Sequence, residues 1–460
     1  MSATLQFLGA AQTVTGSKHL ISVSGKKYLL DCGLFQGRKE ISELNWKPLP
    51  IAPHEIDAVI ITHAHIDHIG YLPKLWKDGF RGPIFCTKAT ADIIRLSLPD
   101  SGEIQEEFAR YANKKGFSRH KPALPLYTAD DAYAVCKLLS TLDFDENYDL
   151  AGKCVMRYRR AGHILGSAFV EFFLPDGRKV LFSGDLGRFN TPIIRDPEVI
   201  EAADILLVES TYGDRVHSNE VAIDELEGVM LEAVKRGGMV IVPAFAIGRT
   251  QDLLYLLHEL QLAGRLPQMP MFVDSPMAID ATAIYSKHHE DHDIEMEALE
   301  DEKKNPLRPK DLLFTRKVGD SKKINEIKGP ALVIAASGMA SGGRVIHHLH
   351  RRLADPDNIV LFAGYQAVGT LGRELVDGAH EVEIMGDRIP VRAMIRKLDS
   401  LSAHADSNEI MHWLGRFKAP PAMTYLVHGD VVPMQTMASR IERELGWKTH
   451  MPELFETVTL

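Results

Sequence analysis

The sequence has few cysteines, no long apolar run and no excess of positive charge. Cys32, Cys86, Cys136 and Cys154 stand far apart without a C-x-x-C pair, which excludes a disulfide framework and a thiolate zinc finger and favours a reducing cytoplasm. No stretch approaches the roughly 18 uninterrupted apolar residues of a membrane span, and no leader is recognisable, so no membrane contact is expected. The formal net charge of -9 excludes a polycation that coats nucleic acid, so any polyanion must be bound locally.

The 460 residues have ordinary globular composition, and this length predicts two domains. Short strands are expected first, then more helical sequence from about 90 to 150, then a hairpin over 168–183. From about residue 205 buried strands alternate with helices, which predicts a largely parallel α/β layer. The charged segment 288–304 is expected to be a solvated loop or an exposed helix rather than a site, despite its histidines.

The stretch 62–68 reads THAHIDH and follows an apolar strand that ends at Ile61. Side chains two apart at a strand end point the same way, so His63 and His65 can bind one ion, while Asp67 and His68 on the turn face a second. Four ligand-type side chains in six residues indicate a metal site more strongly than a helix cap.

Further ligand candidates follow other expected strands on turns flanked by glycine, where the backbone can approach an ion closely. Each signal is weak alone, because a single histidine or aspartate in such a turn is usually a hydrogen-bonding loop residue. The three candidates are His163, Asp185 and His428.

Together these motifs resemble the metallo-β-lactamase superfamily, and the resemblance covers essentially the whole chain. Glu209, in VESTYGD, matches the acidic motif that opens the β-CASP insertion, and His404, in SAHAD, matches its second motif. His428 occupies the third motif, where RNA-processing members have histidine and DNA-repair members typically have valine. The match is best to bacterial and archaeal relatives of the cleavage and polyadenylation endonuclease subunit, although His428-Gly429-Asp430 has aspartate where many relatives have glutamate.

The resemblance implies an α/β fold: a metallo-β-lactamase αββα sandwich with an inserted, largely parallel β-CASP domain. The metallo-β-lactamase domain is expected over residues 1–210 and 394–460, and the β-CASP domain over residues 211–393. It also implies two divalent ions and Asp31 as a carboxylate that holds the ligands in place. The implied ligand sets are His63, His65 and His163 for one ion, Asp67, His68 and His428 for the other, and Asp185 for both.

The implied activity is hydrolysis of RNA by a hydroxide held between the two ions, which leaves 5′-phosphate and 3′-hydroxyl ends. Asp67 and Asp185 take part through the metals, His404 is the candidate general acid, and Glu209 would orient it and favour its charged form. Zinc is favoured, but a ligand set of histidine and aspartate also suits manganese or iron. The expected partner is single-stranded RNA, and a homodimer is compatible with the resemblance.

A glycine-rich loop between an expected strand and helix offers backbone N–H groups to a phosphate, although a plain turn is an equal alternative. The candidate phosphate or RNA contacts are Arg249, Ser337, Gly338, Gly342, Gly343, Arg344, Ser402 and Ala403.

Two other activities remain alternatives. A thioester or lactone hydrolase uses the same metal motif but needs no insertion of about 180 residues. A DNA nuclease of the repair branch is the nearer rival, and His428 argues against it through family resemblance only.

Overall fold

The computed structural model describes residues 3–116, 118, 120–218, 221–301, 305–364 and 366–460. The chain divides into two compact units. Unit 1 comprises residues 1–190, 195–216 and 404–460, and unit 2 comprises residues 191–194 and 217–403. No helix among the described residues has both the length and the apolar character needed to cross a membrane.

Unit 1 contains two seven-stranded sheets. The first has the order β22 (Thr457–Thr459), β1 (Thr4–Phe7), β2 (His19–Val23), β3 (Lys26–Leu30), β4 (Ala58–Ile60), β5 (Ile84–Cys86) and β6 (Leu139–Thr141). The second has the order β21 (Thr449–His450), β20 (Met423–Val427), β11 (Ile205–Glu209), β10 (Lys179–Phe182), β9 (Ala168–Phe173), β8 (Cys154–Arg160) and β7 (Tyr148–Leu150).

One apolar core joins the facing surfaces of the two sheets. It includes Phe7 and Tyr28 from the first sheet and Met156 and Phe172 from the second, all buried. The alternation that produces this core is visible in β8, where buried Cys154, Met156 and Tyr158 alternate with more exposed neighbours. A strand that is buried on both faces is apolar along its length. β11 is such a strand and has only apolar residues before its final glutamate.

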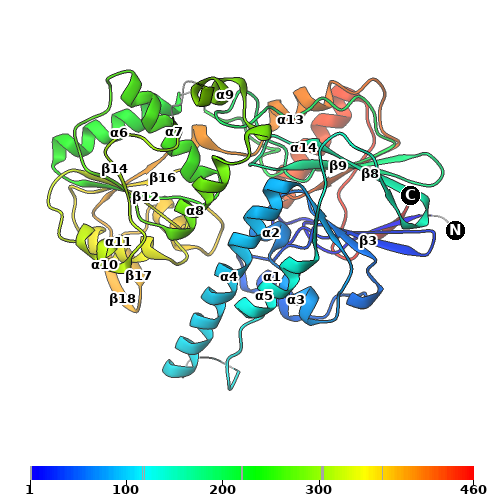
Figure 1. The fold of residues 1–460 in the computed structure, drawn as a ribbon, viewed down its shortest axis with the longest axis horizontal. Helices are drawn as coiled ribbons and strands as arrows, with labels where there is room; N and C mark the ends of the chain where they lie inside the picture. Colours follow the sequence, from blue (N-terminus) through cyan, green and yellow to red (C-terminus); the bar gives the residue numbers. More distant parts are fainter. Residues whose placement is uncertain (1–2, 117, 119, 219–220, 302–304, 365) are drawn as a thin grey trace. The chain divides into compact units, whose positions relative to one another are not determined.

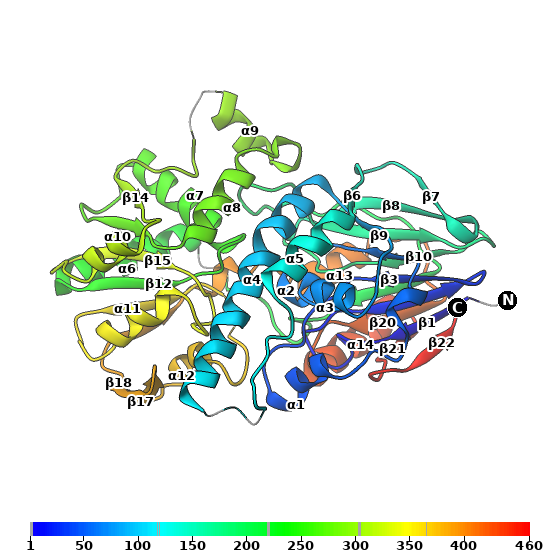
Figure 2. The same cartoon turned by 60° about the horizontal axis from the view of Figure 1, so that its bottom comes forward.

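Helices cover both outer faces of the paired sheets, so unit 1 is an αββα sandwich (Figure 1). A second core packs α13 (Ser407–Leu414) and α14 (Val431–Leu445) onto the outer face of the second sheet. The helices on the opposite side, seen from another direction in Figure 2, are α2 (Ile66–Ile69), α3 (Leu72–Lys77), α4 (Lys88–Lys115) and α5 (Ala129–Val135).

Unit 2 is built on a six-stranded sheet in which every pair is parallel. Its order is β14 (Leu312–Phe314), β13 (Met271–Val273), β15 (Ala331–Ala335), β12 (Met239–Pro243), β16 (Ile359–Phe362) and β19 (Met394–Lys397). One face packs against α10 (Val318–Ile324), α11 (Arg344–Arg352) and α12 (Leu371–Val376). The remaining elements are α6 (Ala222–Arg236), α7 (Arg249–Leu262), α8 (Pro276–Tyr285), α9 (Ile294–Asp301) and the hairpin β17 (Glu381–Ile384) with β18 (Asp387–Pro390).

The charged segment 288–304 departs from its expected character. It contains the short helix α9, whose Ile294 is exposed, but the side chains of His288 and His292 are buried. His292 places Nε2 2.9 Å from the carbonyl of Tyr285, so it is a core histidine rather than a solvated one. Residues 302–304 of this segment lie outside the described part of the chain.

Candidate metal centre

The candidate ligands meet because the strands that precede them are parallel. β3 and β4 run parallel in the first sheet, and β10, β11 and β20 run parallel in the second, so their carboxyl ends lie at one edge of each sheet. Asp31 follows β3, the stretch 62–68 follows β4, Asp185 follows β10, Glu209 ends β11 and His428 follows β20. Every one of these residues belongs to unit 1.

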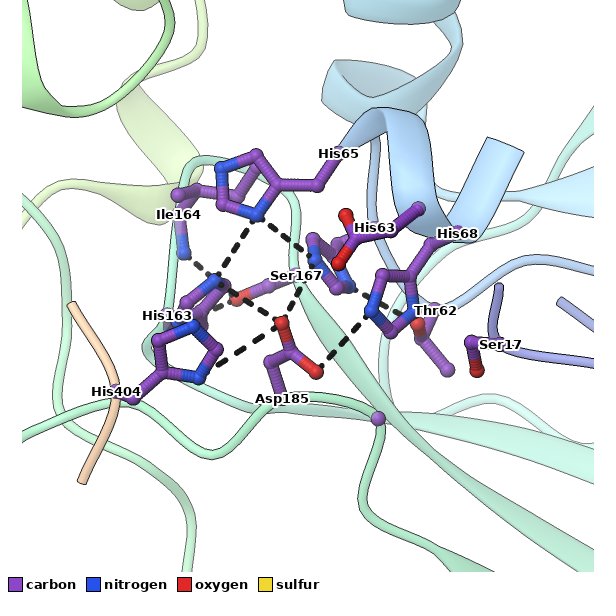
Figure 3. Close-up of polar contacts among 12 residues, drawn as sticks. Ser17, Thr62, His63, His65, His68, His163, Ile164, Ser167, Asp185 and His404 are labelled. Atoms are coloured by element: carbon purple, nitrogen blue, oxygen red, sulfur yellow. Dashed lines mark hydrogen bonds and ion pairs between the residues drawn. The ribbon is translucent and has the colours of Figure 1, made fainter. Parts of the chain in front are cut away.

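The first ligand group consists of three imidazoles and a carboxylate that point toward one another (Figure 3). The Nδ1 atom of His65 lies 3.1 Å from Nε2 of His63 and 3.1 Å from Nε2 of His163. Oδ2 of Asp185 lies 3.3 Å from Nε2 of His63 and 3.4 Å from Nε2 of His163.

The second ligand group consists of Asp67, His68 and His428. Nε2 of His428 lies 3.1 Å from Nε2 of His68 and 3.4 Å from Oδ2 of Asp67. Asp185 turns its other oxygen, Oδ1, to this group, at 3.2 Å from Nε2 of His68. The carboxylate of Asp185 therefore contacts both groups, one oxygen to each.

These atoms have the arrangement expected around cations. Burial holds the pKa of His63 near 3 and that of His65 near 4, and lowers the pKa of His163 well below its usual range, so these imidazoles are neutral. Neutral rings then direct lone pairs at one another, which is unfavourable unless a cation lies between them. Oδ1 of Asp185 is buried without a hydrogen-bond partner among the described residues. The donor set thus fits divalent metal ions.

Neighbouring groups fix which ring nitrogen of each histidine is free. Nδ1–H of His68 donates to Oδ2 of Asp31 at 2.7 Å, and Nδ1–H of His63 donates to the hydroxyl of Thr62 at 3.1 Å. In each case Nε2 is left as the metal-facing atom. Asp31 is fully buried and also accepts from the backbone N–H of Thr62 at 2.8 Å and from the hydroxyl of Ser17 at 3.2 Å.

The loop that carries Asp31 packs directly on the ligand loop. The backbone N–H of Ser17 donates to the carbonyl of Asp67, and that of Cys32 donates to the carbonyl of His68. A Cβ atom at Gly33 would lie 1.5 Å from the carbonyl oxygen of Asp67, so no larger residue fits there. Asp31 and His428 themselves adopt positive φ angles of 56° and 50°, a costly conformation for non-glycine residues that occurs often at functional sites.

His404 and Glu209 lie beside the first ligand group. Nδ1 of His404 is 3.1 Å from both carboxylate oxygens of Glu209 and 3.8 Å from Oδ2 of Asp185. Glu209 is fully buried and accepts from the backbone N–H of Leu186 at 2.6 Å and from the hydroxyl of Thr211 at 2.6 Å. The Thr211 hydroxyl can then accept from Nδ1–H of His428 at 3.1 Å, which leaves Nε2 of that ring for a metal.

The charge on His404 follows from these neighbours. Burial alone would lower the pKa of the imidazole, but the negative charges of Glu209 and Asp185 and the hydrogen bond to Glu209 raise it to about 9. His404 is therefore an imidazolium at neutral pH and can give up a proton from Nε2.

The structure assigns all eight expected phosphate contacts to unit 2, whereas the ligand cluster belongs to unit 1. The side chain of Arg249 is buried and donates to Asp252 at 2.9 Å. Arg344 donates to Asp274 at 2.6 Å and to the carbonyls of Thr315 and Arg316, so its guanidinium is held inside unit 2. The remaining candidates are Ser337, Gly338, Gly342 and Gly343 in the loop between β15 and α11, and Ser402 and Ala403 just before His404.

Several residues of the centre were not singled out by the sequence. Ser17, Thr62 and Thr211 hold ligand or carboxylate orientations through single hydroxyl groups, and serine and threonine are too common in loops for such roles to be visible. Lys18 is buried, with its ammonium donating to the carbonyls of Gly16 and Gly33 and lying 4.3 Å from the centre of the Phe35 ring. A buried lysine between apolar residues carries no distinguishing sequence signal.

Three models of known protein families match this chain, and their ranges include the residues of the candidate metal centre. A β-lactamase superfamily domain matches residues 26–236, a Beta-Casp domain matches residues 250–375, and a Zn-dependent metallo-hydrolase RNA specificity domain matches residues 388–452.

Similar proteins include Ribonuclease TTHA0252 of Thermus thermophilus, which is 38% identical over 92% of each chain. Transcription termination factor FttA of Methanosarcina mazei is 31% identical over 98% of this chain and 71% of its own length. A crystal structure of a protein of unknown function from Enterococcus faecalis V583 shares the fold across both full chains, with a TM-score of 0.56 and 13% identity. The chain therefore belongs to the β-CASP branch of the metallo-β-lactamase superfamily.

Proposed function

We propose that this protein is a metal-dependent ribonuclease that hydrolyses single-stranded RNA to products with 5′-phosphate and 3′-hydroxyl ends. The observation that carries the proposal is a charged histidine, His404, held by Glu209 against a buried cluster of metal ligands. Two comparisons support RNA as the substrate: the RNA specificity domain over residues 388–452, which includes His404 and His428, and the relative named as a ribonuclease.

We assign two divalent cations to the cluster, and zinc is the metal we favour. His63, His65 and His163 would hold one, Asp67, His68 and His428 the other, and Asp185 both. Imidazole and carboxylate ligands without thiolate suit zinc, manganese and iron alike, so the identity rests on the named zinc dependence of the matching family. Bound divalent cations would supply a water nucleophile at neutral pH and neutralise charge on the phosphate.

The chain's own contribution is proton transfer and orientation. Glu209 binds Nδ1–H of His404 and so leaves Nε2–H as the proton that can be given to the departing 3′ oxygen. Glu209 is a positioning residue, because it acts through His404. Three contacts in turn hold its carboxylate, from Leu186, Thr211 and His404.

We further propose that unit 1 is the metallo-β-lactamase domain and unit 2 the β-CASP domain; the units change at residues 216–217 and 403–404, some residues after the expected boundaries at 210 and 393. The glycine-rich loop before α11, with Ser402 and Ala403, remains our candidate for phosphate contacts, whereas Arg249 and Arg344 are already engaged by Asp252 and Asp274. The four cysteines are free thiols, which fits a cytoplasmic protein.

The test compares end-labelled single-stranded RNA and DNA of one sequence, with a thioester substrate as a third arm. We expect RNA to be cleaved much faster than DNA, with a rate that falls as salt screens phosphate contacts. The product ends are read by phosphatase and ligase sensitivity. Equal rates on RNA and DNA would indicate a DNA-branch nuclease, and thioester hydrolysis without nuclease activity would overturn the proposal.

A further inference from the structure

Unit 1 has a cavity outside the ligand cluster, between α13 and the segments around residues 189 and 197, with a volume of about 640 Å³. This volume lies within the usual range of roughly 300–1,000 Å³ for small-molecule sites. The polar and aromatic lining includes Phe189, Asn190, Asn408, His412 and Arg416.

The walls of this cavity continue directly from the residues of the catalytic centre. Gly187 and His404 form a β-bridge, and the backbone N–H of Ala405 donates to the carbonyl of Leu186 at 2.8 Å. Phe189 stands four residues after Asp185, and Asn408 stands four residues after His404. Four residues span at most about 14 Å, so the cavity begins within the reach of nucleotides adjoining a bond that is cleaved at the cluster.

Two side chains on α13 and one just after its end form one stripe toward the cavity. Asn408, His412 and Arg416 follow each other at intervals of four, and all three are exposed. The ring of His412 lies 5.1 Å from that of Phe189 at 86°, and Nε2 of His412 lies 3.1 Å from a guanidinium nitrogen of Arg416. Aromatic, imidazole and guanidinium planes are the groups on which unstacked RNA bases stack, and side-chain amides bind base edges.

The acidic side chains of the cavity are engaged within the protein. Glu409 accepts from Nε of Arg188 at 3.2 Å and from the backbone N–H of Asp406 at 2.9 Å. Asp196 accepts from the backbone N–H of Asn190 at 2.7 Å. The ion pair with Arg188 offsets the charge of Glu409, whereas Asp196 keeps its charge and Arg416, two residues after α13, is an exposed cation on the cavity wall.

We propose that this cavity binds a nucleotide of the RNA strand near the scissile phosphate, with its base against Phe189 and His412 and a phosphate at Arg416. The inference rests on the proposed ribonuclease activity and adds a binding subsite to it. It predicts a contribution to substrate affinity and none to the chemical step, because no lining residue belongs to the ligand cluster or to the His404–Glu209 pair.

The test is steady-state cleavage of an oligoribonucleotide by variants of exposed residues, which should fold normally. His412→Ala and Arg416→Glu should each raise KM roughly tenfold, the effect of losing one base-stacking or phosphate contact, with kcat within about twofold. His412→Phe should keep the wild-type KM, because it keeps an aromatic face. The charge-matched control is Arg443→Glu, at an exposed arginine on α14 that does not line the cavity.

Two further measurements separate this inference from the proposed function. Hydrolysis of bis(p-nitrophenyl) phosphate, which is too small to reach the cavity, should be the same in all these variants. RNA containing 4-thiouridine should crosslink to the peptide over residues 405–416. Unchanged KM in both His412→Ala and Arg416→Glu, while the wild type cleaves RNA, would overturn the subsite and leave the proposed function standing. A wild-type protein that does not cleave RNA would overturn both.

Discussion

The charge that Glu209 places next to His404 predicts a specific change in the pH profile of cleavage. Both carboxylate oxygens lie 3.1 Å from Nδ1 of His404, and Glu209 is fully buried. Glu209→Gln keeps the shape and a hydrogen-bonding oxygen but removes the negative charge. Burial, which lowers the pKa of His404, then dominates, so the pKa should fall from about 9 to near or below the value of an ordinary histidine.

The expected loss follows from the protonated fraction of the general acid. A histidine of pKa about 9 is about 90% protonated at pH 8, and one of pKa about 6.5 only about 3%, so Glu209→Gln should lose about 30-fold in kcat at that pH. The acid form is present below the pKa and disappears as the pH rises through it. The defect should therefore shrink toward pH 6, where the variant regains its proton.

The assay is single-turnover RNA cleavage from pH 5.5 to 9.5. The alkaline limb should move from near 9 in the wild type to below about 7 in Glu209→Gln. The matched control, Glu171→Gln, removes another buried carboxylate of unit 1, paired with Arg157 and Lys179, and should leave the limb unchanged.

Removal of the acid itself gives a second readout. His404→Ala should retain its metal and lose about 10²–10⁴-fold in cleavage at every pH, and adding Glu209→Gln should cost little more. A sulfur leaving atom at the scissile bond departs without a proton and should restore much of the rate in His404→Ala. An alkaline limb that stays near 9 in Glu209→Gln, or an absence of sulfur rescue, would refute the role assigned to His404.

Three further predictions concern the framework of the centre. Asp31→Asn should weaken metal binding about 10–100-fold in a chelator competition, because it weakens the acceptor of His68 Nδ1–H, and unchanged affinity would remove Asp31 from the supporting network. Burial holds the pKa of His19 near 3, so between about pH 6.5 and 3 the metal-free protein takes up a proton at His19 when it unfolds, and its stability falls as the pH falls. His19→Phe should make the melting temperature depend less steeply on pH in this range. An equally steep dependence would contradict the assignment. In denaturant titrations, Gly33→Ala should destabilise the protein by about 1–3 kcal/mol or more, and it should also impair metal binding. Gly228→Ala, in open space within α6, should stabilise the protein by about 0.5–1 kcal/mol. Equal effects of the two substitutions would contradict the close packing described at Gly33.

Much of the fold could be predicted because each element had its own local signal. Buried parallel strands such as β12 and β15 are short apolar runs, and the hairpin of β9 and β10 has a Pro-Asp-Gly turn. The stretch expected to be more helical from about residue 90 contains α4, a single helix that begins at Lys88 and continues through Pro99. Its first half is packed against the protein, and that tertiary support is invisible to local pattern.

The candidate site could be predicted where several residues of metal-ligand type stand close together in the sequence. His63, His65, Asp67 and His68 are close in sequence, so one loop reveals them. Glu209 and His404 are 195 positions apart and came only from family resemblance. The orientation of Asp185, with one oxygen toward each ligand group, and the cavity beside α13 depend on how the loops after separate strands converge, which no single stretch encodes.

Metal content per chain, measured by inductively coupled plasma mass spectrometry on wild type and Asp185→Asn, tests the central claim most directly. Asp185 contacts His63 and His163 through Oδ2 and His68 through Oδ1. We therefore predict close to two divalent ions per chain in the wild type. In Asp185→Asn we predict a clear loss of both metal occupancy and RNA cleavage. One ion or none in an active wild-type protein, or a full complement in Asp185→Asn, would contradict the account.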